Sequence, residues 1–148
     1  MAVYVVRWFR RWMDQYGLAE SDLCRAVQEM AQGLIDARLG GGLVKKRVAR
    51  NGQGKRGGFR TIVATRQSGH WFFVYGFTKS DQANMDRQTE QDCREVARHF
   101  LSLDTKAREC HVDSGQLFEM DCDAQVPEHF SADDARNVLR PLQEWRRH

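Results

Sequence analysis

The chain has 148 residues, of which 41% are hydrophobic and 29% are charged, with only two prolines. This is the size of one folded domain, so the length excludes a pair of full-sized enzymatic domains. The composition excludes a wholly disordered chain. No uninterrupted apolar stretch approaches the roughly 20 residues that cross a bilayer, and the N-terminus lacks the pattern of a secretory signal. We therefore expect a cytoplasmic protein without membrane association.

The charges are unevenly distributed along the chain. Residues 44–66 contain eight basic side chains and no acid, whereas residues 104–134 contain nine acids and two bases. The basic side chains are Lys45, Lys46, Arg47, Arg50, Lys55, Arg56, Arg60 and Arg66. The two regions should occupy different surfaces, and a stripe this basic favours a phosphate backbone or another polyanion.

The first predicted elements are a strand and two helices. Residues 3–6 are β-branched or aromatic and predict a strand. Residues 8–16 predict a helix that Gly17 stops, and a second helix begins at Ser21 and ends at the three glycines 40–42. One face of the first helix carries Trp8, Trp12 and Tyr16. The apolar face of the second helix carries Leu23, Val27, Met30, Ala31, Leu34 and Ile35.

Three strands are predicted next, over residues 43–49, 59–66 and 71–77. Strand alternation places Lys45 and Arg47 on one face of the first of them and Lys46 on the other. The third strand is almost continuously apolar, which is typical of a central strand covered on both faces. Because short connections join the three strands, we expect an antiparallel meander.

A further helix is predicted over residues 88–103, with Thr89 and Asp92 approximating a capping box, followed by a short strand over 116–121. Residues 127–148 are expected to form a helical tail. The prediction is an α+β domain over residues 1–126, in which a small antiparallel sheet packs against helices. The tail is expected to bind a partner or to join two copies in a homodimer.

The four cysteines, Cys24, Cys93, Cys110 and Cys122, lack the two-residue spacing of zinc ribbons and redox dithiols. We expect a reduced chain, with Cys93 packed on the apolar face of its helix. Metal ligation by Cys110, His111, Cys122 and His129 fits no known zinc spacing. No metal or cofactor is expected.

Residues 52–57 match the letter pattern Gly-x-Gly-x-x-Gly, but a dinucleotide-binding loop must open a helix, and this one leads into a strand. A flexible basic hairpin loop is the favoured interpretation. His70 is a candidate acid or base, or a solvated turn residue. Trp8, Trp12 and Trp71 could stack on bases or pack in the core.

The cations on the predicted strands are more specific. Lys45, Arg47, Arg60 and Arg66 could converge on one sheet face, with Lys55 and Arg56 reaching over from the loop. The alternative is a solvated sheet face, although cations without acids repel one another unless a polyanion relieves them. Arg60 is the leading candidate for a phosphate contact, because a guanidinium binds phosphate with two hydrogen bonds.

Four ordered motifs carry a family resemblance. They are Leu34–Gly42, Lys45–Ala49 (Lys-Lys-Arg-Val-Ala), Gly52–Arg60 (Gly-Gln-Gly-Lys-Arg-Gly-Gly-Phe-Arg) and Phe72–Lys79 (Phe-Phe-Val-Tyr-Gly-Phe-Thr-Lys). With their order and spacing, residues 3–121 resemble the RelE/ParE superfamily of bacterial toxins, closest to its RelE/HigB-like branch.

The resemblance implies a small antiparallel sheet packed by helices, neutralisation by a partner antitoxin, and cleavage of messenger RNA on the ribosome by a reaction that uses no metal. Carried over by position, the implied catalytic residues are Lys45, Arg47, Arg60 and Lys79. The other cations of the basic stripe are the candidate RNA-binding residues, namely Lys46, Arg50, Lys55, Arg56 and Arg66. The tyrosine that several relatives carry after the last motif is absent here, so the acid and the base stay unassigned.

Two other functions remain open on the same scaffold. One is a degenerate or regulatory module that binds RNA without cutting it, consistent with the missing tyrosine and with the altered segment Ser80–Asn84. The other is a ParE-like inhibitor of gyrase, in which the basic strand would serve a protein partner.

Overall fold

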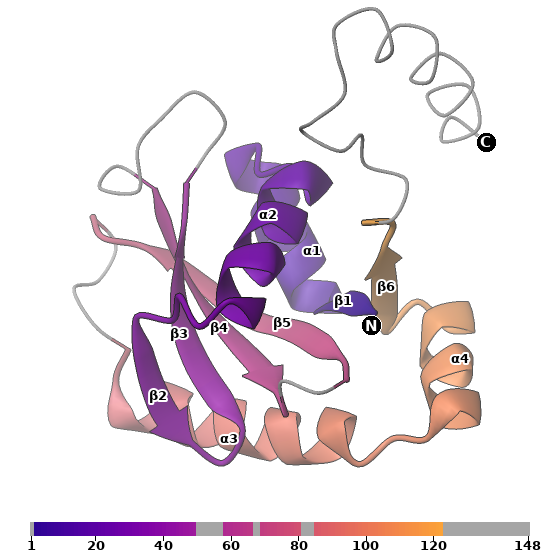
Figure 1. Ribbon diagram of the computed structural model, residues 1–148. Coiled ribbons are helices and arrows are strands. Elements are labelled where there is room, and N and C mark those ends of the chain that lie inside the picture. Colours follow the sequence, from indigo (N-terminus) through magenta and orange to yellow (C-terminus); the bar gives the residue numbers. More distant parts are fainter. Residues whose placement is uncertain (1, 50–57, 67–68, 81–84, 123–148) are drawn as a thin grey trace, which may run out of the picture.

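A six-stranded sheet lies between helices in the computed structural model, which describes residues 2–49, 58–66, 69–80 and 85–122 (Figure 1). The elements in chain order are β1 (Val3–Val6), α1 (Arg7–Tyr16), α2 (Glu20–Ala31), β2 (Ala37–Gly40), β3 (Leu43–Val48), β4 (Phe59–Thr65), β5 (Trp71–Thr78), α3 (Arg87–Leu101), α4 (Thr105–Asp113) and β6 (Leu117–Met120). The predicted α+β class is confirmed.

The strands are ordered β2-β3-β4-β5-β1-β6 across the sheet. The meander of β3, β4 and β5 is antiparallel as predicted, and β2 and β6 extend the sheet in the same antiparallel sense. β1 departs from the expectation because it pairs in parallel with β5, with Val3 beside Trp71 and Val5 beside Phe73. The sheet is therefore mostly, not wholly, antiparallel.

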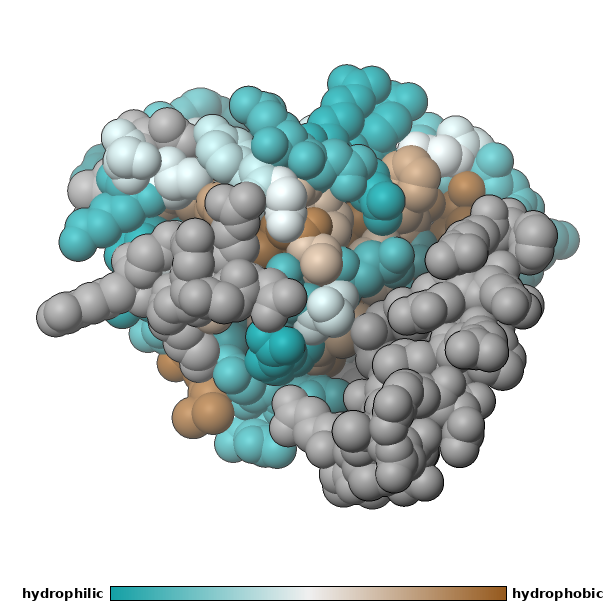
Figure 2. Space-filling view, turned by 90° about the horizontal axis from the view of Figure 1, so that it is seen from above, coloured by the Kyte–Doolittle hydropathy of each residue, from teal (hydrophilic) through white to brown (hydrophobic). Residues whose placement is uncertain are grey.

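Helices cover both faces of the sheet, α1 and α2 on one and α3 on the other (Figure 1). On β5, the ring of Phe73 contacts Phe9 of α1, while its chain neighbour Phe72 stacks on Phe100 of α3. Since successive strand residues point to opposite faces, these two contacts show why β5 needs apolar residues on both sides. Seen from above, hydrophobic side chains show between hydrophilic ones that cover much of the surface (Figure 2).

The second helix is shorter than predicted. α2 ends at Ala31, and Gly33 follows with a φ of 95°, which helical residues do not adopt. Leu34 is 54% exposed, so it does not belong to the buried face of the helix. The glycines 40–42 instead form the turn between β2 and β3, and the sequence pattern did not predict β2.

The start of α3 also differs from the prediction. Asp86, rather than Thr89, is the N-cap, and its side chain accepts a hydrogen bond of 2.7 Å from the backbone N–H of Thr89. This contact lowers the pKa of Asp86, because the hydrogen bond favours the ionised carboxylate. α4 was not predicted, and none of its side chains is buried.

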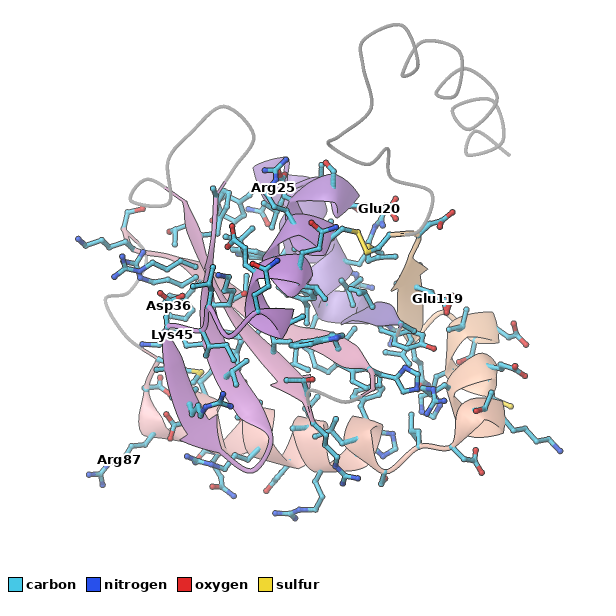
Figure 3. The ribbon with its side chains drawn as sticks, in the orientation of Figure 1. Glu20, Arg25, Asp36, Lys45, Arg87 and Glu119 are labelled. Carbon is cyan, nitrogen blue, oxygen red and sulfur yellow. A yellow bond between two sulfur atoms is a disulfide. The ribbon has the colours of Figure 1, made fainter. Side chains whose placement is uncertain are left out.

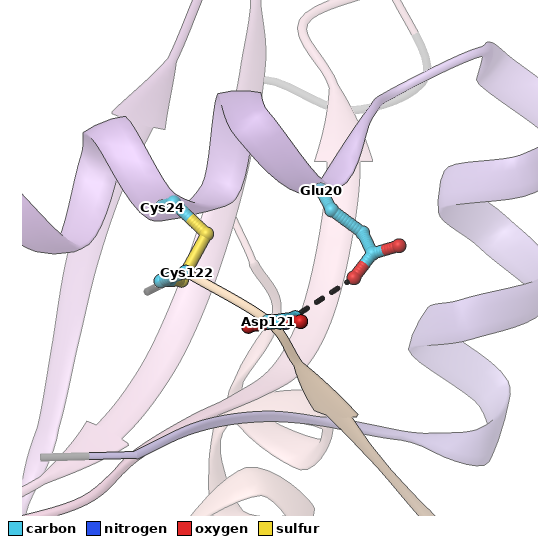
Figure 4. Close-up of a disulfide and its surroundings, with 4 residues drawn as sticks. All are labelled: Glu20, Cys24, Asp121 and Cys122. Carbon is cyan, nitrogen blue, oxygen red and sulfur yellow. Dashed lines mark hydrogen bonds between the residues drawn. A yellow bond between two sulfur atoms is a disulfide. The ribbon is translucent and has the colours of Figure 1, made fainter. Parts of the chain in front are cut away.

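A disulfide joins Cys24 of α2 to Cys122, which lies just beyond β6 (Figure 4). The expectation of a fully reduced chain is therefore wrong for this pair. Close by, the backbone N–H of Asp121 donates to the carboxylate of Glu20 at 3.4 Å. No sequence pattern indicates this pairing, because the two cysteines are 98 residues apart and meet only when β6 joins the sheet. Cys93 is buried as predicted, and burial raises the pKa of its thiol to about 11.

Candidate functional site

The register of β3 and β4 places three of the predicted cations on one face of the sheet. Arg47 lies directly opposite Arg60, and Lys45 lies opposite Ile62, the residue two positions after Arg60. Because residues two apart on a strand share a face, Lys45, Arg47 and Arg60 form one group, which we call the cation cluster. Like charges directly opposite each other destabilise a sheet, so this arrangement favours an anionic ligand.

Arg60 is the most unusual member of the cluster. Arg60 is only 9% exposed, and its Nη1 atom is buried without a hydrogen-bond partner among the described residues. Within the described part of the chain, no carboxylate forms an ion pair with it. A buried guanidinium with an unmade hydrogen bond costs free energy. An oxyanion such as phosphate would supply both the charge and the acceptor that Arg60 lacks.

Arg47 is oriented by a residue that sequence reasoning did not single out. The backbone N–H of Arg47 donates to the carboxylate of Asp36, whose Oδ1 also lies 3.9 Å from the Nε of Arg47. Asp36 and Lys45 lie together at the β2–β3 side of the sheet (Figure 3). The sequence offers no signal for this contact, because the turn after β2 brings Asp36 back beside β3.

Lys46 points to the opposite face from the cluster and is 3% exposed. Its ammonium group donates to the carbonyl of Leu34 at 2.8 Å and lies 2.8 Å from the carboxylate of Glu29. The predicted alternation along β3 is confirmed, but these contacts give Lys46 a structural role. Because its charge is paired beneath α2, Lys46 cannot reach a phosphate at the cluster, and we remove it from the candidate RNA-binding residues.

The other predicted site residues are dispersed. Lys79 is exposed and follows Thr78, which pairs with Phe59, so it lies at the same end of the sheet as Arg60. Arg66 is exposed at the other end of β4, six residues and about 20 Å of extended chain from Arg60. The expectation that Arg66 converges with the cluster is therefore wrong. Three further candidates, Arg50, Lys55 and Arg56, lie outside the described residues.

His70 lies far from the cluster. It precedes the first residue of β5, next to the ring of Tyr4, whereas Phe77, the partner of Arg60, lies at the far end of that strand. Burial and then the nearby charge of Arg108 lower the pKa of His70, so it is neutral near pH 7. As an acid or base for chemistry at the cluster it is too remote.

An aromatic groove of about 330 Å³ lies beside the second half of β5. Its aromatic lining consists of Trp8, Phe9, Trp12 and Tyr16 from α1 and Tyr75 and Phe77 from β5. Trp8 is 47% exposed, while Trp71 is fully buried. The structure thus divides the three tryptophans considered as stacking platforms, with Trp71 in the core and two at the groove.

None of the helices among the described residues is long and apolar enough to span a membrane. In the same part of the chain, no three side chains of His, Cys, Asp or Glu are grouped so that they could hold a metal ion. The described site can offer an anion the guanidinium groups of Arg47 and Arg60 and the ammonium group of Lys45, with the carboxylate of Asp36 beside Arg47.

Comparison with known proteins identifies the family. Residues 1–120 match the family model described as the RelE toxin of the RelE/RelB toxin–antitoxin system. No curated protein matches the chain. Since the match covers most of the 148 residues, the chain belongs to the RelE toxin family, and the resemblance seen in its sequence motifs is confirmed at that level.

Proposed function

We propose that this toxin is an endoribonuclease that cuts messenger RNA on the translating ribosome. The observation that carries the proposal is the buried guanidinium of Arg60, whose Nη1 has no hydrogen-bond partner among the described residues and which lies directly opposite Arg47 on one face of the sheet. Such a pair of guanidinium groups is suited to hold a single phosphate between them. Membership of the RelE toxin family supports a toxic activity that a cognate antitoxin restrains.

In the proposed reaction, the ribose 2′-oxygen attacks the adjacent phosphorus and loses its proton to a base. The bond from phosphorus to the 5′-oxygen then breaks, and that oxygen gains a proton, which leaves a 2′,3′-cyclic phosphate and a free 5′-hydroxyl. Negative charge builds on the non-bridging oxygens in the transition state, where fixed cations stabilise it most.

Each cation has a distinct proposed role. Arg60, held rigidly by burial, binds the scissile phosphate, and Arg47, aligned by Asp36, contacts the same group from the neighbouring strand. Lys45 and Lys79 are more exposed than Arg60. Their positive charges attract the phosphate oxygens more strongly as negative charge builds up in the phosphorane. Arg50, Lys55, Arg56 and Arg66 are proposed to follow the RNA backbone away from the cut.

The proposed partners follow from the same function. The antitoxin would neutralise the toxin, and the ribosome would present the message. With these partners the protein would act in the cytoplasm. The tail of residues 127–148 is proposed to bind the antitoxin or to join two copies of the chain.

RNA binding without cleavage is a second candidate function. It is favoured by the positions of the described histidines, because His70 and the pair His99 and His111 lie near Tyr4 and Phe100, away from the cation cluster. A scaffold that lacked a proton carrier at the cluster would hold a phosphate without promoting attack on it.

Growth inhibition by paired variants tests the site. Neutralising the cluster with Lys45→Gln and Arg60→Gln should abolish toxicity after induced expression, whereas Arg98→Gln with Lys106→Gln, two exposed cations on α3 and α4, should leave it intact. Glutamine is chosen because a charge reversal at the buried Arg60 could unfold the chain. If the cluster variant folds, as thermal melting would show, and remains as toxic as the unmodified protein, the assignment of the site is wrong.

A further inference from the structure

Two histidine side chains face each other where α3 adjoins α4 (Figure 1). His99 lies in the last turn of α3 and His111 in the last turn of α4. Their Nε2 atoms are 3.3 Å apart, and their ring centroids are 5.3 Å apart, so the Nε2 atoms lie on the facing sides of the two rings. The usual donor–acceptor distance of an N–H hydrogen bond is about 2.9–3.0 Å, so the rings make at most a weak one.

The backbone of α4 fixes the orientation of the His111 ring. The Nδ1 atom of His111 lies 2.8 Å from the carbonyl oxygen of Ala107. Because a carbonyl can only accept, Nδ1 carries the proton, and the Nε2 atom of the neutral ring keeps its lone pair. Histidines that bind metals hold their second ring nitrogen in this way. His111 therefore presents a free lone pair toward His99.

The distance between the two nitrogens suits a tetrahedral metal ion. A zinc ion binds histidine nitrogen at about 2.0–2.1 Å. At those bond lengths, nitrogens separated by 3.3 Å form an angle of about 105–110° at the ion, which is the tetrahedral angle that zinc prefers. Two neighbouring ligands of an octahedral ion meet at a right angle and would need to lie closer together.

The surroundings of the pair favour a cation. Both histidines lie in the last turn of a helix, where the helix dipole stabilises positive charge. Residues 104–122, which include α4 and β6, contain five acids and two bases. One of the bases, Arg108, donates to the carbonyl of Leu103 and to the hydroxyl of Thr105. An anion would therefore find less favourable charge here than a cation.

The pair is open to solvent. His99 is exposed and His111 is half-buried. Among the described residues, no third side chain of His, Cys, Asp or Glu completes a metal-binding group, so water would fill the remaining coordination positions. Cys122, which the sequence offered as a ligand beside His111, is bonded to Cys24. The arrangement is that of an open site that exchanges its ion with solvent, unlike a closed structural zinc site.

We propose that His99 and His111 bind one Zn²⁺ ion through their Nε2 atoms and thereby link α4 to α3. In the bound form the ring of His99 carries its proton on Nδ1. Zinc is favoured because imidazole suits it and because the angle is tetrahedral. α4 has no buried side chain, so the ion adds an attachment to a helix that the core holds weakly. The site is separate from the proposed nuclease function, because it uses no residue of the cation cluster.

Zinc titration of the untagged, full-length protein at neutral pH tests the site. After removal of metals with a chelator, calorimetry should show binding of one Zn²⁺ ion per chain, and saturating zinc should raise the melting temperature by a few degrees. His99→Gln and His111→Gln each remove one of two ligands and should weaken zinc binding at least about tenfold. His70→Gln, a histidine next to Tyr4, and Cys110→Ala, an exposed thiol beside His111, should leave binding unchanged.

Nuclear magnetic resonance separates direct ligation from an indirect effect. Long-range nitrogen–proton spectra of the imidazole rings should show the Nε2 resonances of His99 and His111 shifting with zinc while Nδ1 stays protonated. Melting of the variants without zinc verifies their fold.

The inference is overturned if zinc does not bind, if His99→Gln and His111→Gln bind it as tightly as the unmodified protein, or if Cys110→Ala abolishes binding. Toxicity is measured separately, so the zinc site can fail while the proposed function stands.

Discussion

Lys46 and Arg60 are both buried cations on adjacent strands, but in the described part of the chain only Lys46 has a carboxylate within ion-pair distance. Lys46 is anchored beneath α2 by Glu29 and by a backbone carbonyl. Arg60 has no carboxylate partner among the residues that the structure describes, and it lies on the same face of the sheet as Arg47. Burial alone therefore does not separate structural cations from functional ones, whereas the presence of a partner does.

Lys46→Met should destabilise the protein without affecting its toxicity per folded molecule. Removing the ammonium leaves Glu29 beside a buried methionine, and since Glu29 keeps a quarter of its side-chain exposure, we expect a loss of roughly 1–3 kcal/mol in the free energy of unfolding. Urea denaturation measures the loss. A variant of unchanged stability that is no longer toxic would instead indicate that Lys46 contacts the substrate.

His70 should make stability depend on pH. Its pKa in the folded state lies below the ordinary value of 6.5 because of burial and the charge of Arg108. The unfolded chain then binds more protons below about pH 6.5, so the free energy of unfolding should fall as the pH decreases through this range. Denaturation between pH 5 and 8 should show a smaller decrease for His70→Gln. Identical profiles would contradict this role.

At the scale of elements, the disulfide connects α2 to the end of β6 and closes a loop of nearly the whole domain. Closing a loop of about 100 residues stabilises a protein by about 4–5 kcal/mol through the entropy of the unfolded chain. Because cytosolic thiols are kept reduced, the proposed action on ribosomes would require the packed core to hold β6 in place without this bond.

Reduction should therefore lower the melting temperature of the oxidised protein. Cys24→Ala should melt at a temperature that does not respond to reductant, whereas Cys110→Ala, which alters an exposed free thiol, should keep the full response. Melting curves with and without dithiothreitol measure the effect. An unmodified, oxidised protein that melts at the same temperature in both conditions would show that the bond contributes nothing to stability.

Strands with clear alternation could be predicted, whereas the end of a helix could not. β5 was predicted from its almost continuous apolar run, and alternation along β3 alone predicts that Lys45 and Arg47 share a face. The spacing of Leu34 continues that of α2, although the backbone leaves the helix at Gly33. The contact of Asp36 with Arg47 depends on that change of direction and left no local pattern to detect.

At the scale of the whole molecule, charge is separated across the sheet. The cation cluster lies on β3 and β4, while the described acids after residue 103 lie on α4, on β6 and next to them, at the opposite edge (Figure 3). The sequence predicts different surfaces for the basic and the acidic regions. The strand order separates them, because β1 and β5 lie between β4 and β6. A polyanion approaching this molecule would be steered toward the cluster and away from β6.

The most direct test of the central claim, ribosome-dependent cleavage of messenger RNA at the cation cluster, is primer extension on an abundant translated message after induced expression of the toxin, with and without ribosomes. We predict cuts within codons that appear only when the message is translated and that disappear with Lys45→Gln and Arg60→Gln. Growth arrest with intact messages, accompanied by inhibition of gyrase in a supercoiling assay, would contradict the account.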